Sequence, residues 1–187
     1  MHLLSKRLQH AGKPHTATYE PTDGPVGKLL RAILAQDVKM LPATIAMLYA
    51  ADRYEHVNAP ETGIMARASR GELVISDRYI FSSLAYQSIE CGLELVSALN
   101  SSFPLPRCLI FIDTPVHVSQ KRLSGRGKAE LFDAEAFQAR VRENYMAAME
   151  RYRPSGMAIS VVDGDRPPEA IHEEIWKILS GLPITGM

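Results

Sequence analysis

The sequence predicts an α/β fold in which a parallel sheet is covered by helices on both faces. The strands expected over 73–76 and 108–112 are short, nearly unbroken apolar runs, which are typical of strands buried on both sides. Each run is followed by a segment with helical periodicity, and this alternation indicates parallel strands joined by helical crossovers. With 187 residues and neither an internal repeat nor a linker, the chain is expected to form a single domain, residues 1–187.

The first third of the chain is expected to alternate between helix and strand. Residues 3–11 carry apolar side chains at helical spacing and end at Gly12, a residue that commonly follows a helix. A strand is expected over 15–19, and it runs into Glu20-Pro21-Thr22-Asp23-Gly24-Pro25, a turn rich in helix- and strand-breaking residues. The other elements expected here are helices over 26–34 and 41–70, the second interrupted at Pro60.

The rest of the chain continues the same alternation. The strand over 73–76 is expected to lead into one long helix, 79–97, whose apolar residues keep helical spacing. The next strand, 108–112, ends at Asp113. The last expected elements are helix 116–124, helix 134–152, strand 157–162 and helix 168–180.

Composition excludes several classes of partner. Lys plus Arg and Asp plus Glu both number 21, so no basic field predicts binding to nucleic acid. No segment approaches the ~18 apolar residues of a membrane span, and residues 1–7 lack the apolar core of a secretory signal. Cys91 and Cys108 show neither metal-ligand spacing nor a disulfide framework and are expected to be small buried residues. A soluble, cytoplasmic protein is expected.

The clearest functional motif follows the strand over 73–76. Asp77 and Arg78 stand at its carboxyl end, where ligands bind in open parallel sheets. A carboxylate there suits a hydrated divalent metal, and a guanidinium can hold a phosphate with two parallel hydrogen bonds. Ser83, Tyr86 and Gln87 then follow at helical spacing, so they can touch the same small molecule. This combination predicts nucleotide phosphate chemistry.

Two further pairs of residues can contribute to the same site. Glu20 lies in the Pro/Gly-rich turn and Arg31 on the following helix, so a carboxylate and a guanidinium can face a ligand together. The alternative is a tight turn with a solvated charge. Tyr49 and Arg53 are four residues apart on a helix, so a ring can stack on a base while the guanidinium binds its carbonyl edge. The alternative is a core tyrosine and a surface arginine.

A basic segment, 121–128, forms the last candidate. It holds four positive charges and no acid, with two glycines that permit a mobile loop. Such a loop, with Arg122 and Arg126, can close over a phosphate chain and neutralise charge that develops during transfer. A basic segment that is simply solvated is the alternative.

Taken together, these motifs resemble those of the thymidylate kinases, P-loop enzymes that phosphorylate dTMP. The resemblance is collinear and covers nearly the whole chain. Its parts are the substrate-side loop and helix at 20–31, the thymine-contacting helix at 47–53, the Asp-Arg-Tyr signature at 77–87 and the lid at 122–133. The resemblance implies a three-layer P-loop-kinase-type fold and the reaction ATP + dTMP → ADP + dTDP, with Mg²⁺ as cofactor.

The resemblance also implies a role for each nucleoside-binding residue. Tyr49 stacks on thymine, where the family more often has phenylalanine, and Arg53 hydrogen-bonds the carbonyl edge of the base. Ser83 and Gln87 read the rest of the base. Tyr86 packs against the sugar and disfavours a ribose 2′-hydroxyl.

The phosphates and the metal have their own implied contacts. Arg31 and Arg78 clamp the dTMP phosphate, and Glu20 faces the sugar and the water shell linked to the metal. Asp77 helps to hold Mg²⁺, through water. The residues implied to reach the ATP phosphates when the lid closes are Arg122 and Arg126.

The chain departs from the family pattern in two places. Tyr19 precedes Glu20 where the family often has arginine, so that charge contact is missing. The phosphate-loop motif G-x-x-x-x-G-K-[ST], on which transfer depends in such enzymes, is also missing. The three Gly-Lys pairs are followed by Pro14, Leu29 and Ala129, none of which completes it. The first strand and the phosphate loop are therefore expected to be absent, and efficient transfer by this chain is not expected.

Three hypotheses for function stay open at this point. The chain is a shortened thymidylate kinase, an inactive nucleotide-binding or interaction remnant of that family, or another nucleoside or nucleotide monophosphate kinase. Arg53 and Gln87 suit a thymine edge better than adenine and favour the first two. The family is usually dimeric, and the apolar stretches at 41–50 and 84–99 allow a homodimer. Selectivity between dTMP and dUMP is left open.

Overall fold

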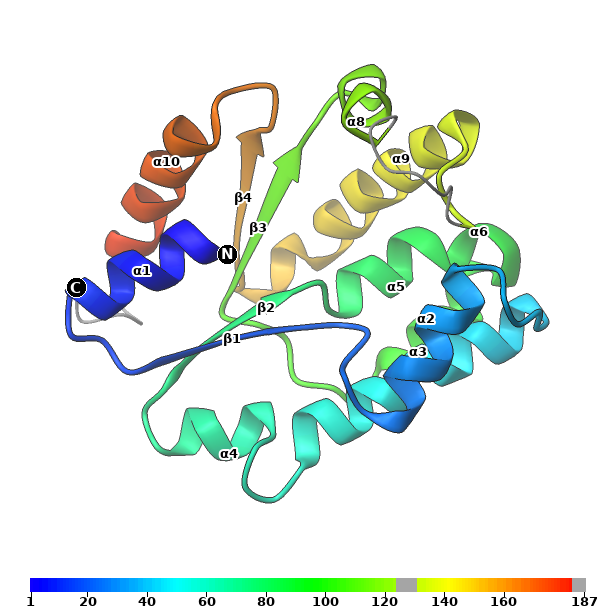
Figure 1. Ribbon diagram of the computed structural model, residues 1–187, viewed down its shortest axis with the longest axis horizontal. Coiled ribbons are helices and arrows are strands. Elements are labelled where there is room, and N and C mark those ends of the chain that lie inside the picture. Colours follow the sequence, from blue (N-terminus) through cyan, green and yellow to red (C-terminus); the bar gives the residue numbers. More distant parts are fainter. Residues whose placement is uncertain (124–130, 183–187) are drawn as a thin grey trace.

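The computed structural model describes residues 1–123 and 131–182, and four strands in two parallel pairs lie at its centre (Figure 1). The pairs are β1 (His15–Tyr19) with β2 (Leu73–Asp77), and β3 (Cys108–Asp113) with β4 (Ala158–Asp163). Each strand lies within one residue of its predicted bounds, and the α/β class is confirmed. Among the described residues no backbone ladder connects β2 to β3, so the expected sheet is present as two pairs.

One hydrophobic cluster spans both strand pairs. Its helices are α1 (His2–His10) and α10 (Pro168–Ser180). Leu8 of α1 and Leu179 of α10 belong to this buried cluster, which also includes Ile75 of β2 and Ile110 of β3 at its periphery. Because the two pairs share these contacts, side-chain packing holds them together where backbone hydrogen bonds do not.

A second cluster packs helices against the other side of the strands. Phe81 and Leu84 lie three residues apart on one helix, so both point into this cluster, where they meet Val96 and Ala148. Leu109 of β3 packs against the same residues. The helices that contribute are α3 (Pro42–Asn58), α5 (Ile80–Tyr86), α7 (Leu93–Asn100) and α9 (Glu135–Tyr152).

Helix α2 (Pro25–Leu34) packs on α3 through Leu30, Ile33 and Ile45. At the start of α2 the chain passes very close to the turn that follows β1. A Cβ added to Gly27 would lie 1.9 Å from the carbonyl oxygen of Thr22, so only glycine fits there. Helix α2 and the turn are therefore fixed against each other.

The long helix expected over 79–97 is wrong in one respect, because three helices occupy that part of the chain. Helices α5 and α7 are separated by the short α6 (Ser88–Cys91), and Gly92 has φ of +77° between α6 and α7. A residue with positive φ interrupts a helix, and glycine adopts such a conformation at little cost. The break expected near Pro60 is confirmed, since α3 ends at Asn58. The other described helices are α4 (Ile64–Ser69), α8 (Val116–Leu123) and a 3-10 turn, Arg153–Ser155.

Three smaller expectations can be compared with the structure. Of the expected lid, 122–133, residues 124–130 lie outside the described part of the chain. None of the helices that are described is long and apolar enough to cross a bilayer. Cys91 and Cys108 are free thiols that are partly rather than fully buried, and burial raises the pKa of Cys108.

Truncating a core leucine on α1 tests whether the shared cluster holds the two strand pairs together. Leu8 is fully buried, whereas Leu3 on the same helix is 37% exposed. We expect Leu8→Ala to lower the free energy of unfolding by roughly 2–5 kcal/mol, because it leaves a cavity between the pairs. Leu3→Ala is the matched control, with an expected change within about 0.5 kcal/mol. Urea denaturation measures both, and equal effects would contradict this view of the core.

Candidate functional site

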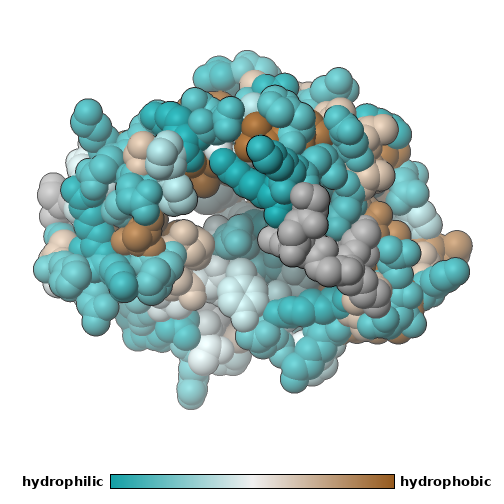
Figure 2. All heavy atoms as spheres, turned by 45° about the horizontal axis from the view of Figure 1, so that its top comes forward, coloured by the Kyte–Doolittle hydropathy of each residue, from teal (hydrophilic) through white to brown (hydrophobic). Residues whose placement is uncertain are grey.

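The strand register brings the two predicted polar segments to one edge. Tyr19 is paired with Asp77 at the carboxyl ends of β1 and β2, and the backbone N–H of Glu20 donates to the Asp77 carbonyl oxygen at 3.0 Å. Figure 2, in which the carboxyl ends of β3 and β4 are turned forward, shows a hollow rimmed mainly by hydrophilic residues. This end of the strands is where ligands bind in parallel α/β folds.

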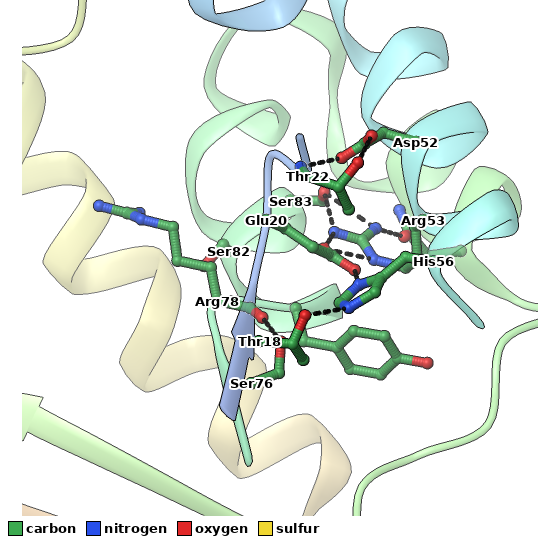
Figure 3. A network of polar contacts seen from close by, with 12 residues as sticks. Thr18, Glu20, Thr22, Asp52, Arg53, His56, Ser76, Arg78, Ser82 and Ser83 are labelled. Atoms are coloured by element: carbon green, nitrogen blue, oxygen red, sulfur yellow. Dashed lines mark hydrogen bonds and ion pairs between the residues drawn. The ribbon is translucent and has the colours of Figure 1, made fainter. Parts of the chain in front are cut away.

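A buried ion pair lies behind this edge (Figure 3). The Nε and Nη2 atoms of Arg53 donate to Oε2 of Glu20 at 3.0 and 2.6 Å. Arg53 is 1% exposed and Glu20 is 4% exposed. The other donors of Arg53 reach the Ser83 hydroxyl, at 3.2 Å from both Nη1 and Nη2, and the side-chain oxygen of Asn100. These five contacts match the five N–H groups that a guanidinium can donate.

His56 occupies the second oxygen of Glu20. Its Nδ1 lies 3.1 Å from Oε1 of Glu20, and its Nε2 lies 2.7 Å from the Thr18 hydroxyl. Because a carboxylate can only accept, Nδ1 carries a proton, and in neutral His56 Nε2 accepts from Thr18. Arg53 and His56 are three residues apart on one face of α3, so this helix anchors both ends of the carboxylate.

Two aromatic rings enclose the Arg53 guanidinium. Its central carbon lies 5.3 Å from the ring centroid of Tyr79 and 5.7 Å from that of Phe103. Burial raises the pKa of Tyr79 to about 12, although the charge of Arg53 opposes the shift. The Tyr79 hydroxyl donates to the Pro104 carbonyl oxygen at 3.1 Å. The cation is therefore held by rings as well as by acceptors.

The turn after β1 is fixed from two sides. The backbone N–H and the hydroxyl of Thr22 donate to the buried Asp52 carboxylate at 2.8 and 2.6 Å. From α2, Arg31 donates to the Thr22 carbonyl oxygen and, at 2.7 Å, to the Asp23 carboxylate. The Asp23 side chain is largely solvent-exposed, and that of Arg31 is partly exposed. A rigid turn thus presents an exposed charged group at the strand edge.

Arg78 extends away from the buried network, toward α9 (Figure 3). Its φ of +69° is unusual for a residue with a side chain and indicates local strain at the strand end. The guanidinium carbon lies 5.1 Å from the ring centroid of Tyr86. Tyr86 in turn contacts the rings of Phe132, Phe137 and Tyr145. Arg78 was predicted from its place at the strand end and Tyr86 from its helical spacing, and the two side chains are neighbours.

The other predicted residues are distributed around this centre. Tyr49 packs against the cluster of α2 and α3, and Gln87 is buried at the end of α5. Arg122 is exposed on α8, where its Nη1 donates to the Gly164 carbonyl oxygen at 3.1 Å. Arg126 lies outside the described residues. Its predicted contact with ATP stays a prediction.

Two residues predicted to contact the substrate have protein partners in the structure. Arg53 was expected to present its guanidinium to a base, but in this conformation each of its N–H groups has a protein acceptor. Glu20 was expected to face a sugar and a metal-linked water shell, but both of its oxygens are bonded to α3. Both differences have one cause, because each buried charge needs the other as its partner.

A metal would have few protein ligands here. Among residues 1–123 and 131–182, no group of three or more His, Cys, Asp or Glu side chains is close enough to hold an ion. Asp77 is a single exposed carboxylate at the strand end. That arrangement fits Mg²⁺, which keeps several waters and binds through one or two carboxylates together with substrate phosphates.

Several residues of this site were not predicted from the sequence. His56, Asn100 and Asp52 complete the buried network. The signal for two of them was present, because Asp52 and His56 flank Arg53 on α3 and a helix rarely buries three ionisable groups without partners. Asn100 carries no such signal, since it lies 47 residues from Arg53.

Comparison with known proteins places this geometry in context. A family model described as thymidylate kinase matches residues 1–175. A putative thymidylate kinase of Treponema pallidum is 35% identical over 175 residues, which is 92% of this chain and 83% of that protein. A putative thymidylate kinase of Aeropyrum pernix is 36% identical and covers 88% of this chain and 78% of its own length. The thymidylate kinase of Carboxydothermus hydrogenoformans is 34% identical, with 96% and 88% covered.

Breaking the buried ion pair tests its structural role. We expect Arg53→Met to lower the free energy of unfolding by roughly 3–5 kcal/mol, because Glu20 is left as an uncompensated buried charge. Adding Glu20→Gln to that variant is expected to recover much of the loss. The control is Arg153→Met, since the exposed pair of Arg153 with Glu150 is expected to contribute nothing measurable. Denaturant unfolding of the native chain, the two single arginine variants and the double variant measures these free energies. Equal effects of Arg53→Met and Arg153→Met would contradict a structural role for the buried ion pair.

Proposed function

Because the chain belongs to the thymidylate kinase family, we propose that it carries the dTMP-binding side of an ATP:dTMP phosphotransferase. The observation that supports this best is the strand edge itself. Exposed Arg31 and Arg78 stand there in front of a buried network that includes Ser83. Cations at the rim and a preorganised polar floor suit a nucleoside monophosphate, which has an anionic end and a polar base.

The base is proposed to bind at the floor of the site. Tyr49 stacks on thymine, and Ser83 and Gln87 meet its polar edge. The two contacts of Arg53 with Ser83, at 3.2 Å, are longer than its bonds to Glu20 at 3.0 and 2.6 Å. The Ser83 contacts are therefore the ones that a thymine carbonyl oxygen can replace, while the ion pair with Glu20 persists.

The phosphate is proposed to bind at the rim. Arg31 and Arg78 clamp its oxygens, since paired guanidinium N–H groups match the geometry of a phosphate. The Tyr86 ring lies against the Arg78 guanidinium and is proposed to pack against the sugar. Glu20, inside the fold, acts on this part of the site only by holding the strand end and the turn in place.

The ATP side is proposed to depend on Mg²⁺ and on the lid. Mg²⁺ bound with ATP neutralises phosphate charge, and Asp77 would hold it through water. Arg122 and Arg126 would contact the ATP phosphates. Transfer in this class of enzyme proceeds by positioning and charge neutralisation, without a covalent enzyme intermediate.

We also propose a cytoplasmic homodimer. Leu41, Met47 and Leu93 are large exposed apolar residues within the two stretches predicted to allow dimerisation. Such residues lose contact with water when a second copy covers them. Light scattering coupled to size exclusion measures the mass of the particle in solution.

Binding measurements test the phosphate clamp. We expect the chain to bind dTMP more tightly than thymidine, and Arg78→Met to weaken dTMP binding by roughly 10- to 100-fold, since a hydrogen bond to a charged group contributes about 1.5–3 kcal/mol. Thymidine binding should be unchanged. The matched control is Arg151→Met, an exposed arginine near the C-terminal end of α9. Calorimetry measures the affinity of each variant for dTMP and for thymidine. Equal affinity of the native chain for the two ligands would contradict the proposal.

Turnover is a separate question from binding, because the sequence contains no phosphate-loop motif. We expect ADP release with ATP, Mg²⁺ and dTMP only from a version extended at its N-terminus by a strand and a G-x-x-x-x-G-K-[ST] loop. Backbone N–H groups of such a loop cradle the phosphates, and electrostatic contributions of this kind are worth several kcal/mol each. Turnover by the chain alone would contradict this expectation. Binding of dTMP without turnover in either form would favour an inactive nucleotide-binding protein.

A further inference from the structure

Tyr19 has no role in the site described so far. It is the last residue of β1, it is 45% exposed, and it is the register partner of Asp77 at the carboxyl edge. Its hydroxyl donates to Oδ2 of Asp23. Oδ1 of the same carboxylate accepts from Nη2 of Arg31 at 2.7 Å, and the guanidinium carbon of Arg31 lies 5.7 Å from the Tyr19 ring centroid. One tyrosine therefore contacts both partners of an exposed ion pair.

A substrate phosphate would have to compete with Asp23 for Arg31. Asp23 and the phosphate are both anions, and Asp23 already accepts from Nη2 of Arg31, while Nη1 is bound to the Thr22 carbonyl oxygen. Arg31 can exchange Asp23 for the phosphate more easily if the Asp23 carboxylate keeps another hydrogen-bond donor after Arg31 has left it. The Tyr19 hydroxyl is such a donor, since it can go on bonding Asp23 after Arg31 has released it.

The ring of Tyr19 has a second effect on Arg31. Attraction between a guanidinium and an aromatic face does not depend on which anion the N–H groups meet. The ring can therefore hold Arg31 at the strand edge both before and after the exchange. Neither effect requires a charge at position 19.

We propose that Tyr19 is a positioning residue for the substrate phosphate: it retains Asp23 through its hydroxyl and Arg31 through its ring, so that Arg31 exchanges the carboxylate for the phosphate of a nucleoside monophosphate. The proposal rests on the proposed function, in which Arg31 contacts that phosphate. It accounts for a neutral aromatic residue at the edge of an anion site.

The test compares dTMP with thymidine, which lacks the phosphate, by calorimetry on the full chain. Tyr19→Leu removes the ring and the hydroxyl, and we expect dTMP binding to weaken by about 2- to 5-fold, the size of an exposed cation–π contact. Tyr19→Phe keeps the ring but leaves Asp23 to compete for Arg31, so dTMP binding should also weaken. Thymidine binding should not change in either variant. The control is Tyr54→Phe, an exposed tyrosine on α3.

A second substitution separates positioning from a general structural effect. Asp23→Asn removes the competing charge, so in the Tyr19→Phe background it should restore dTMP affinity to at least that of the native chain. A structural defect would not be repaired in this way. Failure of that rescue, or equal losses for dTMP and thymidine, would overturn the proposal.

The preference of the native chain for dTMP over thymidine distinguishes a failure of the proposed function from a failure of the role of Tyr19. If it does not prefer dTMP to thymidine, both the proposed function and the role of Tyr19 are overturned. If it prefers dTMP and the Tyr19 variants behave like Tyr54→Phe, only the role of Tyr19 is overturned.

Discussion

The ion pair between Arg53 and Glu20 is the interaction on which the candidate site depends. Burying two charges costs free energy that their attraction repays only when the remaining donors and acceptors are also satisfied. Here Ser83, Asn100 and His56 satisfy them. The network therefore requires α3, α5, α7 and the end of β1 to be in place together. The strand end, from which the exposed groups of the site project, is fixed as a consequence.

The arginines of the site differ in how deeply they are buried. Arg53 is enclosed by protein acceptors and two rings, so its charge serves the fold. Arg31 and Arg78 keep part of their surface exposed to solvent, and each guanidinium lies close to a tyrosine ring. Interactions at exposed positions are weak enough to be exchanged for a ligand. Burial therefore separates the arginine that holds the site together from the two arginines that are proposed to bind the phosphate.

Patterns between neighbouring residues in the sequence correctly predicted the features that depend only on such neighbours. The apolar run over 108–112 and the polar residues directly after the strand over 73–76 depend on neighbours in sequence, and both predictions agree with the elements found. The break at Gly92 was missed, because apolar periodicity continues across it and only the backbone angle changes. The burial of Arg53 was not predicted, since its partners Glu20 and Asn100 lie 33 and 47 residues away. No helical or strand period reports contacts at that distance.

The most direct test of this account is a crystal structure of the chain with dTMP bound. We expect the phosphate between Arg31 and Arg78, the base against Ser83 and Gln87, and the bonds between Arg53 and Glu20 unchanged. A phosphate bound away from both exposed arginines, or a base that separates Arg53 from Glu20, would contradict the division of the site into a buried anchor and an exchangeable rim.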